Sequence, residues 1–419
     1  MASREVGADL WLSEYITPWD IYVHGLTKVF AYKKTPYQEM YIVETGIYGK
    51  ALVLDGKWQS CTGDEFLYHE PLVHPAMICH GSPGKVLVLG GAEGATIREV
   101  FRWKGVKKVA MVDIDGEVVE TCRQYLPEMH TNAFDAPRLQ LIIDDALEFL
   151  DTSSESWDVV ISDLSDPIEE GPSFQLFTKN YFEKILRVLT PGGFFVVQAG
   201  PVSPGEMKLH ARIVNTMKAV FPYVQSYNSH VPTYGRPWGF VLGSRKMIDS
   251  RPEPETVDKF LKEKTIGGFR MLDGVTLLGM LQVPLYLREA IATETKIYTL
   301  ASRNTLHVRH CSLISIVMCI SIKNILFSTL GVIQEIGKEK EDFKELIIIA
   351  QNDFIDNFRV KKEIYQESLN NFNKYMTKSK NDSHLLSVEL YKMRENIDYE
   401  KIYCLYDLIK EKILLTKLI

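Results

Sequence analysis

The feature that most constrains the fold is a regular alternation of short apolar runs and helical stretches between residues 85 and 198. The apolar runs are KVLVLG (85–90), KVAMVD (108–113), LQLII (139–143), WDVVISD (157–163) and FFVVQ (194–198), and helical stretches near 95–103, 117–126 and 179–189 lie between them. Buried strands that alternate with helices indicate a parallel sheet covered on both faces. Ligands of such sheets bind beyond the carboxyl ends of the strands, so the informative side chains should follow each run.

The preceding segment, from about residue 10 to residue 80, has a β-rich pattern. Apolar or alternating stretches lie at 29–31, 37–44 and 50–55, and Thr35-Pro36, Thr45-Gly46 and Asp55-Gly56 punctuate them as turns. We therefore expect an α/β protein with a small N-terminal antiparallel β domain (1–80) followed by a Rossmann-like domain (81–300).

Beyond about residue 300 the composition changes. All 18 prolines precede this point, and only Gly331 and Gly337 of the 27 glycines follow it. Apolar residues recur at near-helical spacing between 343 and 372, which predicts a mainly α-helical extension over 301–419. The apolar stretch 312–333 carries Lys323 and Asn324 near its middle, whereas a membrane span needs about 20 largely uncharged residues. We expect no membrane segment.

The charge distribution bears on the kind of partner. The formal net charge is -6, but residues 1–300 hold 30 Lys and Arg against 38 Asp and Glu, giving -8, and the remainder is at +2. An acidic domain disfavours nucleic acid and favours cationic substrates. The six cysteines form no CxxC pair, and the N-terminus lacks the basic start and apolar core of a secretory signal. A cytoplasmic protein without a metal site is expected.

The glycine-rich loop GGAEGAT (90–96) follows the first apolar run and opens a helix. Gly90, Gly91 and Gly94 permit a tight turn and a close approach of the backbone to a ligand. Asp113 ends the second run, 19 residues after Gly94, where a carboxylate can accept bonds from both ribose hydroxyls. The loop contains no basic residue and no GK[ST], which disfavours a P-loop. A nucleoside without phosphate is favoured, and a dinucleotide stays open on spacing alone.

Acidic residues also follow the third and fourth runs. Asp145 is the stronger candidate to accept a hydrogen bond from an adenine amino group, and Asp144 is the candidate cap of the next helix.

Asp163 and Asp166 lie three residues apart after the fourth run. An amine substrate has a pKa of about 10, like lysine, so it arrives protonated. One carboxylate can take its proton as general base while the other holds the chain.

Glu93 places a third acid inside the glycine loop. A glutamate there would repel the carboxylate on the amino-acid arm of S-adenosylmethionine. It would instead attract the ammonium group of the decarboxylated donor, which favours aminopropyl transfer over methyl transfer. Two alternatives stay open: an S-adenosylmethionine-dependent methyltransferase on the same fold, and a non-catalytic polyamine-binding protein.

These motifs resemble those of the polyamine aminopropyltransferases, the family of spermidine and thermospermine synthases. The resemblance runs from about residue 10 to residue 300. Its carrying motifs are LVLDGKWQSCTGDEFLYHE (52–70), HPAM (74–77), VLGGAEGAT (88–96), VDIDGEVVE (112–120), DDALEF (144–149), SDLSDPIEEGP (162–172), VVQAGP (196–201), HVPTYG (230–235) and TETKIY (293–298).

The resemblance implies a reaction in which decarboxylated S-adenosylmethionine is the co-substrate, with no permanently bound cofactor, and a homodimer or homotetramer. It implies that Asp163 accepts the proton and that Asp166 grips the amine. The amine channel would be lined by Tyr68, His69, Glu93, Pro172, Gln198 and Tyr234. The methylthioadenosine part of the donor would contact the glycine loop together with Gln59, Asp113, Asp145 and Ala146.

Three departures bear on the acceptor. Many family members have GGG where this chain has Gly90-Gly91-Ala92, and many spermidine synthases have QGE at 198–200, where this chain has QAG. The loop from Asp166 to Pro172 is also longer than theirs. QAGP and EEGP resemble the thermospermine-synthase and thermophile-type branch. Putrescine and spermidine are therefore both candidate acceptors, with agmatine as an alternative.

Overall fold

The computed structural model describes residues 7–17, 19–165 and 172–300. The strands are β1 (Leu10–Tyr15), β2 (Ile21–Lys34), β3 (Glu39–Thr45), β4 (Gly49–Leu54), β5 (Lys57–Cys61), β6 (Lys85–Gly90), β7 (Lys108–Asp113), β8 (Leu139–Ile143), β9 (Trp157–Asp163), β10 (Leu189–Pro201), β11 (Tyr223–Val231) and β12 (Arg236–Ser244).

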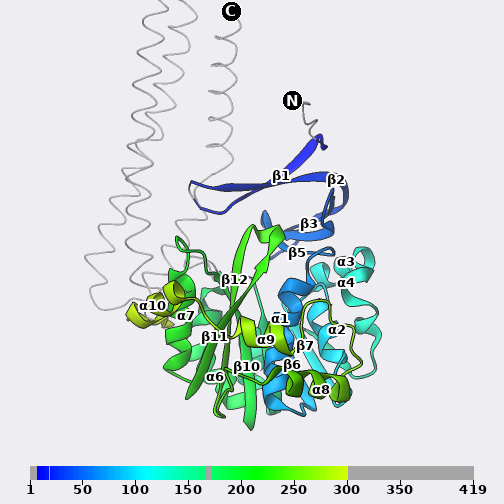
Figure 1. Cartoon of the computed structure of the whole chain (residues 1–419). Helices are drawn as coiled ribbons and strands as arrows, with labels where there is room; N and C mark the ends of the chain where they lie inside the picture. The colour runs from blue at the N-terminus through cyan, green and yellow to red at the C-terminus, as the bar shows by residue number, and fades with distance from the viewer. Residues whose placement is uncertain (1–6, 18, 166–171, 301–419) are drawn as a thin grey trace, which may run out of the picture. The chain divides into compact units, whose positions relative to one another are not determined.

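Helices connect and cover these strands (Figure 1). The α-helices are α1 (Phe66–His80), α2 (Ala95–Phe101), α3 (Gly116–Tyr125), α4 (Pro127–His130), α5 (Ala146–Thr152), α6 (Lys179–Val188), α7 (Lys208–Lys218), α8 (Pro254–Lys264), α9 (Gly274–Met280) and α10 (Leu285–Thr293). In the part of the chain that the structure describes, the short 3₁₀ turns are η1 (Ala133–Asp135), η2 (Pro172–Phe177) and η3 (Pro232–Tyr234).

The N-terminal sheet is an antiparallel meander in the order β1-β2-β3-β4-β5, as the sequence predicts. Its tightest connection is the two-residue turn Asp55-Gly56 between β4 and β5. Both residues have positive φ angles, 49° and 74°, as a type I′ hairpin turn requires. The meander ends at Cys61, and the chain then enters α1.

The prediction of a β-rich segment up to residue 80 is wrong for its last part. Residues 66–80 form α1, which packs against β9, β10, β11 and α2. Ten consecutive residues of this helix, Tyr68–Met77, are buried, so it has no solvent-exposed polar face. Amphipathic spacing is the usual sequence signal of a helix, and a helix buried on all sides lacks it. Pro71 and Pro75, within the helix, further obscure the pattern.

The second sheet has seven strands in the order β11-β12-β10-β9-β6-β7-β8. The five strands predicted from the sequence are parallel, whereas β12 pairs antiparallel with both β10 and β11. The sheet is therefore mixed rather than wholly parallel. Side chains on the two faces of the sheet pack into separate hydrophobic cores. Val86 and Val88 of β6 belong to one core, and Leu87 and Leu89 belong to the other. Helices cover both faces, as expected for a Rossmann-like sheet (Figure 1).

Within the ranges that the structure describes, no single helix is long and apolar enough to cross a membrane. Only α9 and α10 meet the length and composition criterion together, as a pair bent by 46°. The chain divides into two units between Leu300 and Ala301. The predicted helical extension and the apolar stretch 312–333 lie outside the described residues.

Candidate active site

The site is built at the carboxyl edge of the seven-stranded sheet, where four parallel strands end side by side. Gly90 at the end of β6 is the direct ladder partner of Asp163 at the end of β9. On the other side of β6, Asp113 ends β7 and pairs with Ile143 of β8, which leads into Asp144 and Asp145. The predicted glycine loop and the acids Asp113, Asp145 and Asp163 therefore share one edge, in the sheet order β9-β6-β7-β8.

The glycines of this loop have positive φ angles of 84° (Gly90), 81° (Gly91) and 80° (Gly94). A Cβ atom on Gly90 would lie 2.1 Å from the carbonyl oxygen of Asp163, and one on Gly94 would lie 2.6 Å from Cβ of His130. The Gly91 N–H donates a 3.0 Å hydrogen bond to that same Asp163 carbonyl. The loop therefore lies directly against the end of β9, which only glycine allows.

The carboxylate of Asp163 is held by two hydroxyl groups. Tyr68 of α1 donates to Oδ1 at 2.8 Å, and Thr96 of α2 donates to Oδ2 at 2.5 Å. Each carboxylate oxygen can accept a further bond, so Asp163 keeps lone pairs for a substrate proton. Burial and the charge of Asp163 raise the pKa of Tyr68 well above its ordinary value, so this phenol stays a donor.

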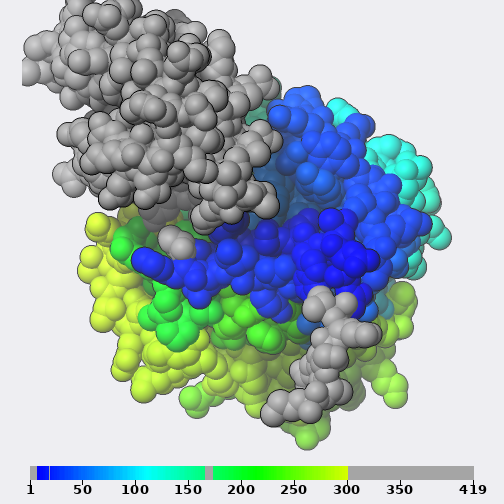
Figure 2. Space-filling model, turned by 90° about the horizontal axis from the view of Figure 1, so that it is seen from above, coloured from blue at the N-terminus to red at the C-terminus, as the bar shows by residue number. Residues whose placement is uncertain are grey.

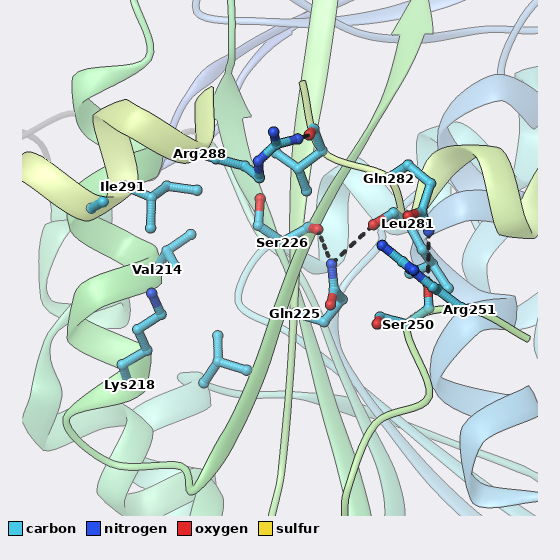
Figure 3. A pocket seen from close by; sticks show the side chains of 13 residues that line it. Val214, Lys218, Gln225, Ser226, Ser250, Arg251, Leu281, Gln282, Arg288 and Ile291 are labelled. Carbon is cyan, nitrogen blue, oxygen red and sulfur yellow. Dashed lines mark hydrogen bonds between the residues drawn. The ribbon is translucent and has the colours of Figure 1, made fainter. Parts of the chain in front are cut away.

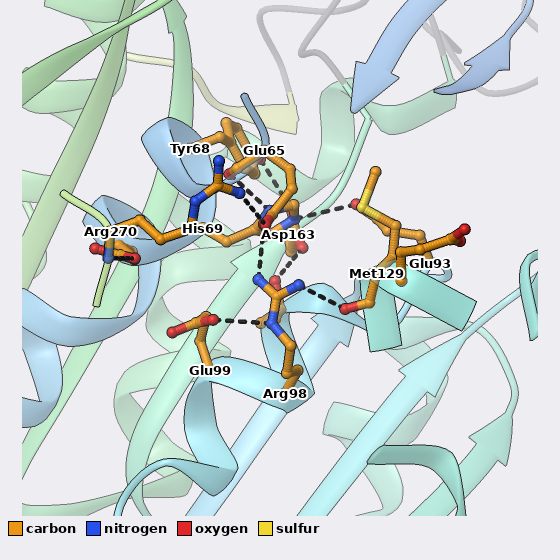
Figure 4. Close-up of polar contacts among 12 residues, drawn as sticks. Glu65, Tyr68, His69, Glu93, Arg98, Glu99, Met129, Asp163 and Arg270 are labelled. Carbon is orange, nitrogen blue, oxygen red and sulfur yellow. Dashed lines mark hydrogen bonds and ion pairs between the residues drawn. The ribbon is translucent and has the colours of Figure 1, made fainter. Parts of the chain in front are cut away.

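Glu93 and His69 form a buried pair beside Asp163. Nε2 of His69 lies 3.1 Å from Oε1 of Glu93, and Nδ1 lies 3.0 Å from Oε2 of Glu65 and 2.9 Å from its carbonyl oxygen. The His69 side chain is fully buried and Glu93 is 7% exposed. Figure 4 shows this cluster together with Arg98, which reaches Glu65 from α2.

The pKa values of Asp163 and Glu93 shift in opposite directions. Burial, followed by the negative charge of Glu93, raises the pKa of Asp163. Burial also opposes ionisation of Glu93, but the hydrogen bond and charge of His69 outweigh it and lower the pKa of Glu93. Pairs of acids with divergent pKa values are typical of acid-base sites. Glu93 is suited to stay charged, and Asp163 is suited to take up a proton.

The predicted nucleoside acids lie at the other end of the same edge. Asp113 is partly buried, and its Oδ1 accepts a 2.9 Å bond from the backbone N–H of Asp115. Burial raises the pKa of Asp113 to about 7, with Asp115, Glu93 and Asp163 adding to the effect. Ribose hydroxyls would supply donors that favour its charged form.

Asp145 caps helix α5, and the expectation that Asp144 would do so is wrong. Oδ1 of Asp145 accepts from the backbone N–H groups of Leu147 at 2.6 Å and Glu148 at 3.4 Å. The Asp144 side chain instead accepts from the Asp145 N–H at 2.8 Å. Either of two adjacent aspartates could occupy the N-cap position of α5. The sequence alone does not show which of them has the extended backbone conformation that this position requires. Ala146, the first residue of α5, is buried beside this cap.

Aromatic side chains border the Asp163 end of the site. Tyr234 of η3 donates its hydroxyl to the backbone carbonyl of Gln59, so these two predicted residues meet. The centroid of the Tyr234 ring lies 6.0 Å from that of the Tyr68 ring and 4.9 Å from that of the Trp238 ring. The Gln59 amide donates to the carbonyl of Lys57 at 3.1 Å.

Gln198 of β10 is 1% exposed, and its amide is used within the protein. Its Nε2 donates to the carbonyl of Leu164 at 2.9 Å, and its oxygen accepts from the Trp238 indole at 3.0 Å. Gln198 therefore fixes the backbone that directly follows Asp163. Asp166 lies outside the described residues, and the Pro172 side chain is likewise not described.

The site also contains a group of side chains that could hold a metal ion. One ligand atom from each of His69, Glu93 and Asp163 lies within 4.8 Å of the others. However, Nε2 of His69 faces Glu93 at hydrogen-bond distance, and Nδ1 faces two oxygen acceptors. A metal ligand must be a neutral imidazole, so metal binding would have to remove either the Nε2 proton that faces Glu93 or the Nδ1 proton that faces Glu65. The contacts favour an internal ion pair.

A cavity of about 590 Å³ lies elsewhere, between α7, β11 and α10 (Figure 3). Its lining includes Ser226, Arg251 and Arg288, and none of the residues predicted for the site. We place the reaction at the strand ends, because the cavity contains no acid among its lining residues.

Three residues of the site were not predicted from the sequence: Thr96, Glu65 and Arg98. Thr96 lies in the first turn of α2, within the quoted glycine-loop motif, so its position next to the strand edge was a usable signal. Glu65 precedes His69 by four residues, the spacing of neighbours on a helix face. Arg98 had no signal of this kind, because its contacts with Glu65 and Met129 depend on tertiary packing.

Comparison with known proteins bears on this geometry. Residues 65–252 match the family model of the spermine/spermidine synthase domain, and residues 10–61 match that of the spermidine synthase tetramerisation domain. A polyamine aminopropyltransferase of Synechococcus sp. (strain JA-2-3B'a(2-13)) is 55% identical over 297 residues, covering 69% of this chain and 95% of that protein.

Solved structures of spermidine synthases share the fold of this chain. The crystal structure of spermidine synthase from Thermotoga maritima matches with a TM-score of 0.62 at 27% identity, covering 68% of this chain and 95% of that one. A spermidine synthase in complex with the transition-state analogue AdoDATO matches with a TM-score of 0.63 at 27% identity, covering 70% and 99%. The identity, the coverage and the shared fold show that this chain is an enzyme of the spermine/spermidine synthase family, the polyamine aminopropyltransferases.

Proposed function

We propose that this enzyme transfers the aminopropyl group of decarboxylated S-adenosylmethionine to putrescine or spermidine and releases 5′-methylthioadenosine. The observation that carries the proposal is the pair of buried Glu93 and half-buried Asp163 at the strand edge that also holds Asp113 and Asp145. Such a cluster suits a cationic donor arm and a cationic acceptor. The relative solved with AdoDATO supports a donor of this class.

In the proposed reaction the acceptor amine enters protonated and gives one proton to the carboxylate of Asp163. The freed nitrogen lone pair forms a bond to the aminopropyl carbon next to the sulfonium, and the carbon–sulfur bond breaks. Its electron pair stays on sulfur, which becomes the neutral thioether of methylthioadenosine. The leaving group needs no acid, so positioning of nitrogen and carbon supplies much of the rate.

The roles of the surrounding residues follow from their contacts. Tyr68 and Thr96 orient Asp163, and its raised pKa makes it a stronger base than an ordinary aspartate. Ionised Glu93 attracts the ammonium of the donor. We assign Asp113, Asp145, Ala146, Gln59 and the glycine loop to the methylthioadenosine part, and Asp166, His69, Pro172, Gln198 and Tyr234 to the amine side.

The acceptor is identified by one experiment on the full-length chain. Decarboxylated S-adenosylmethionine is incubated separately with putrescine, spermidine and agmatine, and products are identified by mass spectrometry. We expect an aminopropyl adduct of putrescine or spermidine together with methylthioadenosine. An adduct of agmatine alone would replace the proposed acceptor, and methylation from S-adenosylmethionine without any aminopropyl product would refute the proposed reaction.

We also propose a cytoplasmic homodimer or homotetramer that requires no bound metal and no permanent cofactor. Apolar side chains on β1 and β2 support the oligomer, because Leu10, Tyr15 and Ile21 are all more than half exposed in the single chain. Figure 2 shows these strands on the face seen from above. Sedimentation should give a species of two or four chains, and a monomer at micromolar concentration would contradict this.

The sequence places the domain boundary at residue 80, but α1 packs on the second sheet, so we assign the N-terminal β domain to residues up to Cys61, the catalytic domain to about 62–300 and the extension to 301–419. The family resemblance ends near residue 300, and the similar proteins cover 69–70% of this chain, so we expect a chain that ends at Leu300 to stay active. Its kcat should lie within about threefold of that of the full chain. Loss of folded, active enzyme would show that the extension belongs to the catalytic unit.

A further inference from the structure

The protonation state of His69 follows from its contacts. Nδ1 faces the carbonyl oxygen and the carboxylate of Glu65, which only accept hydrogen bonds, so Nδ1 carries a proton. Nε2 faces the carboxylate of Glu93 at 3.1 Å. An imidazole donates from both nitrogens only in its charged form. Burial alone would lower the pKa of His69, but Glu65 and Glu93 outweigh it and raise that pKa to about 10.

A second layer of charge lies behind this histidine. Arg98 donates to Oε2 of Glu65 at 2.7 Å, the oxygen that also faces His69 Nδ1. The Arg98 side chain is 14% exposed and the Glu65 side chain 6%. Its remaining nitrogens donate to Glu99 at 2.9 Å and to the carbonyl of Met129 at 2.7 Å, so its position is fixed. The charges therefore alternate from Glu93 through His69 and Glu65 to Arg98.

The titratable and charged groups around His69 come from four further segments besides its own helix and the residue before that helix. Tyr68 and Glu65 come from α1 and the residue before it, Glu93 from the glycine loop, Asp163 from β9 and Arg98 from α2. Arg270 approaches Glu65 at 4.0 Å from the segment before α9. Burial opposes ionisation of Glu65, but the hydrogen bonds and charges of His69 and Arg98 outweigh it and lower the pKa of Glu65. Arg98 therefore keeps Glu65 ionised, and ionised Glu65 holds the proton on His69 Nδ1.

We propose that Glu65 and Arg98 are positioning residues that keep His69 doubly protonated, so that Glu93 stays ionised and aimed at the ammonium group of the donor. This inference rests on the proposed function, since it concerns recognition of the aminopropyl donor. Neither residue touches the reacting atoms. Without the Glu65 charge, His69 would lose a proton, and its Nε2 lone pair would face the Glu93 carboxylate. Glu93 would then take up a proton or turn away, and in both cases the donor would lose its anionic partner.

The test combines kinetics with the spectrum of the histidine in the full-length enzyme. Selective ¹⁵N-histidine labelling, with His69→Gln for assignment, reports whether both ring nitrogens of His69 carry protons. In the wild type we expect the imidazolium pattern at pH 8, above the ordinary histidine pKa of about 6.5. A neutral His69 at pH 8 would overturn the inference without reference to any variant.

The variants are Glu65→Gln and Arg98→Met, with Arg98→Lys as the conservative rescue. Arg102→Met is the matched control, because Arg102 lies on the same side of the cluster and pairs with Glu99 rather than Glu65. We expect Glu65→Gln and Arg98→Met to raise the donor KM about tenfold or more, because the ammonium group of the donor loses its anionic partner, with kcat within about threefold. Arg98→Lys and Arg102→Met should retain the wild-type KM and the imidazolium signal.

Two results would contradict the inference. One is an unchanged donor KM and imidazolium signal in folded Glu65→Gln. The other is an equal rise of KM in Arg102→Met, which would show only a general loss of packing. If wild-type enzyme forms no aminopropyl product, the proposed function fails, whereas the wild-type ¹⁵N spectrum still decides whether His69 is charged. The two failures are thus distinguishable.

Discussion

The phenol of Tyr68 donates a 2.8 Å hydrogen bond to Oδ1 of Asp163, across 95 residues of sequence. This contact joins the buried helix α1 to the end of β9 and orients the carboxylate that we assign as proton acceptor. Thr96 holds the second oxygen from α2. A carboxylate fixed from both sides is oriented before substrate arrives, as efficient proton transfer requires.

Asp163→Asn should abolish most of the turnover while leaving the nucleoside site intact. The amide cannot accept the amine proton, so kcat should fall by about 10² to 10⁴. Calorimetric binding of methylthioadenosine should remain within about threefold. Asp151→Asn on α5 is the control and should keep full activity, because Asp151 forms an ion pair with Lys184 of α6 away from the strand ends. Turnover of Asp163→Asn near the wild-type level would remove Asp163 as the base.

The pH profile should report the raised pKa of Asp163. Only the ionised carboxylate accepts a proton, so kcat should fall as the pH drops through a value above the ordinary aspartate pKa of about 3.9. The Thr96 hydroxyl lowers this pKa, so Thr96→Val should move the acid limb to higher pH. Thr121→Val on α3 is the control for a threonine substitution. A limb that stays in place in Thr96→Val would contradict the assignment of this limb to Asp163.

Gly90→Ala should damage both stability and ligand binding. Its Cβ would lie 2.1 Å from the backbone oxygen of Asp163, and its φ of 84° is strained for alanine. The left-handed conformation alone costs about 1–2 kcal/mol, and the clash adds to it. Urea unfolding and methylthioadenosine binding measure the two effects. Gly192→Ala, which meets no atom within 4 Å, should leave both unchanged. A wild-type-like Gly90→Ala would refute the tight-loop description.

The strand ends of the site could be predicted from the sequence because parallel strands place them on one edge. Gly90, Asp113 and Asp163 each follow an apolar run, and the structure brings them together there. The antiparallel pairing of β12 was not predicted, because an apolar run carries no direction. The short connection through η3 reverses the chain and makes β11 and β12 antiparallel neighbours.

The layer behind the site was harder to predict. Arg98 and Glu65 meet only after α1 and α2 pack together, and neither belongs to a motif that implies an ion pair. The choice between Asp144 and Asp145 as helix cap depended on backbone angles, since Asp145 is extended with φ of -68° and ψ of 129°. Apolar patterns therefore predict where strands end, and tertiary packing decides how side chains at those ends are supported.

The central claim is that Glu93 recognises an ammonium group where S-adenosylmethionine carries a carboxylate as well. Calorimetric binding of the decarboxylated and carboxylated donors to the wild type and to Glu93→Gln tests it most directly. We expect the wild type to bind the decarboxylated donor at least about tenfold more tightly, equivalent to about 1.4 kcal/mol, and Glu93→Gln to lose most of this preference. Equal or tighter binding of the carboxylated donor by the wild type would contradict the account.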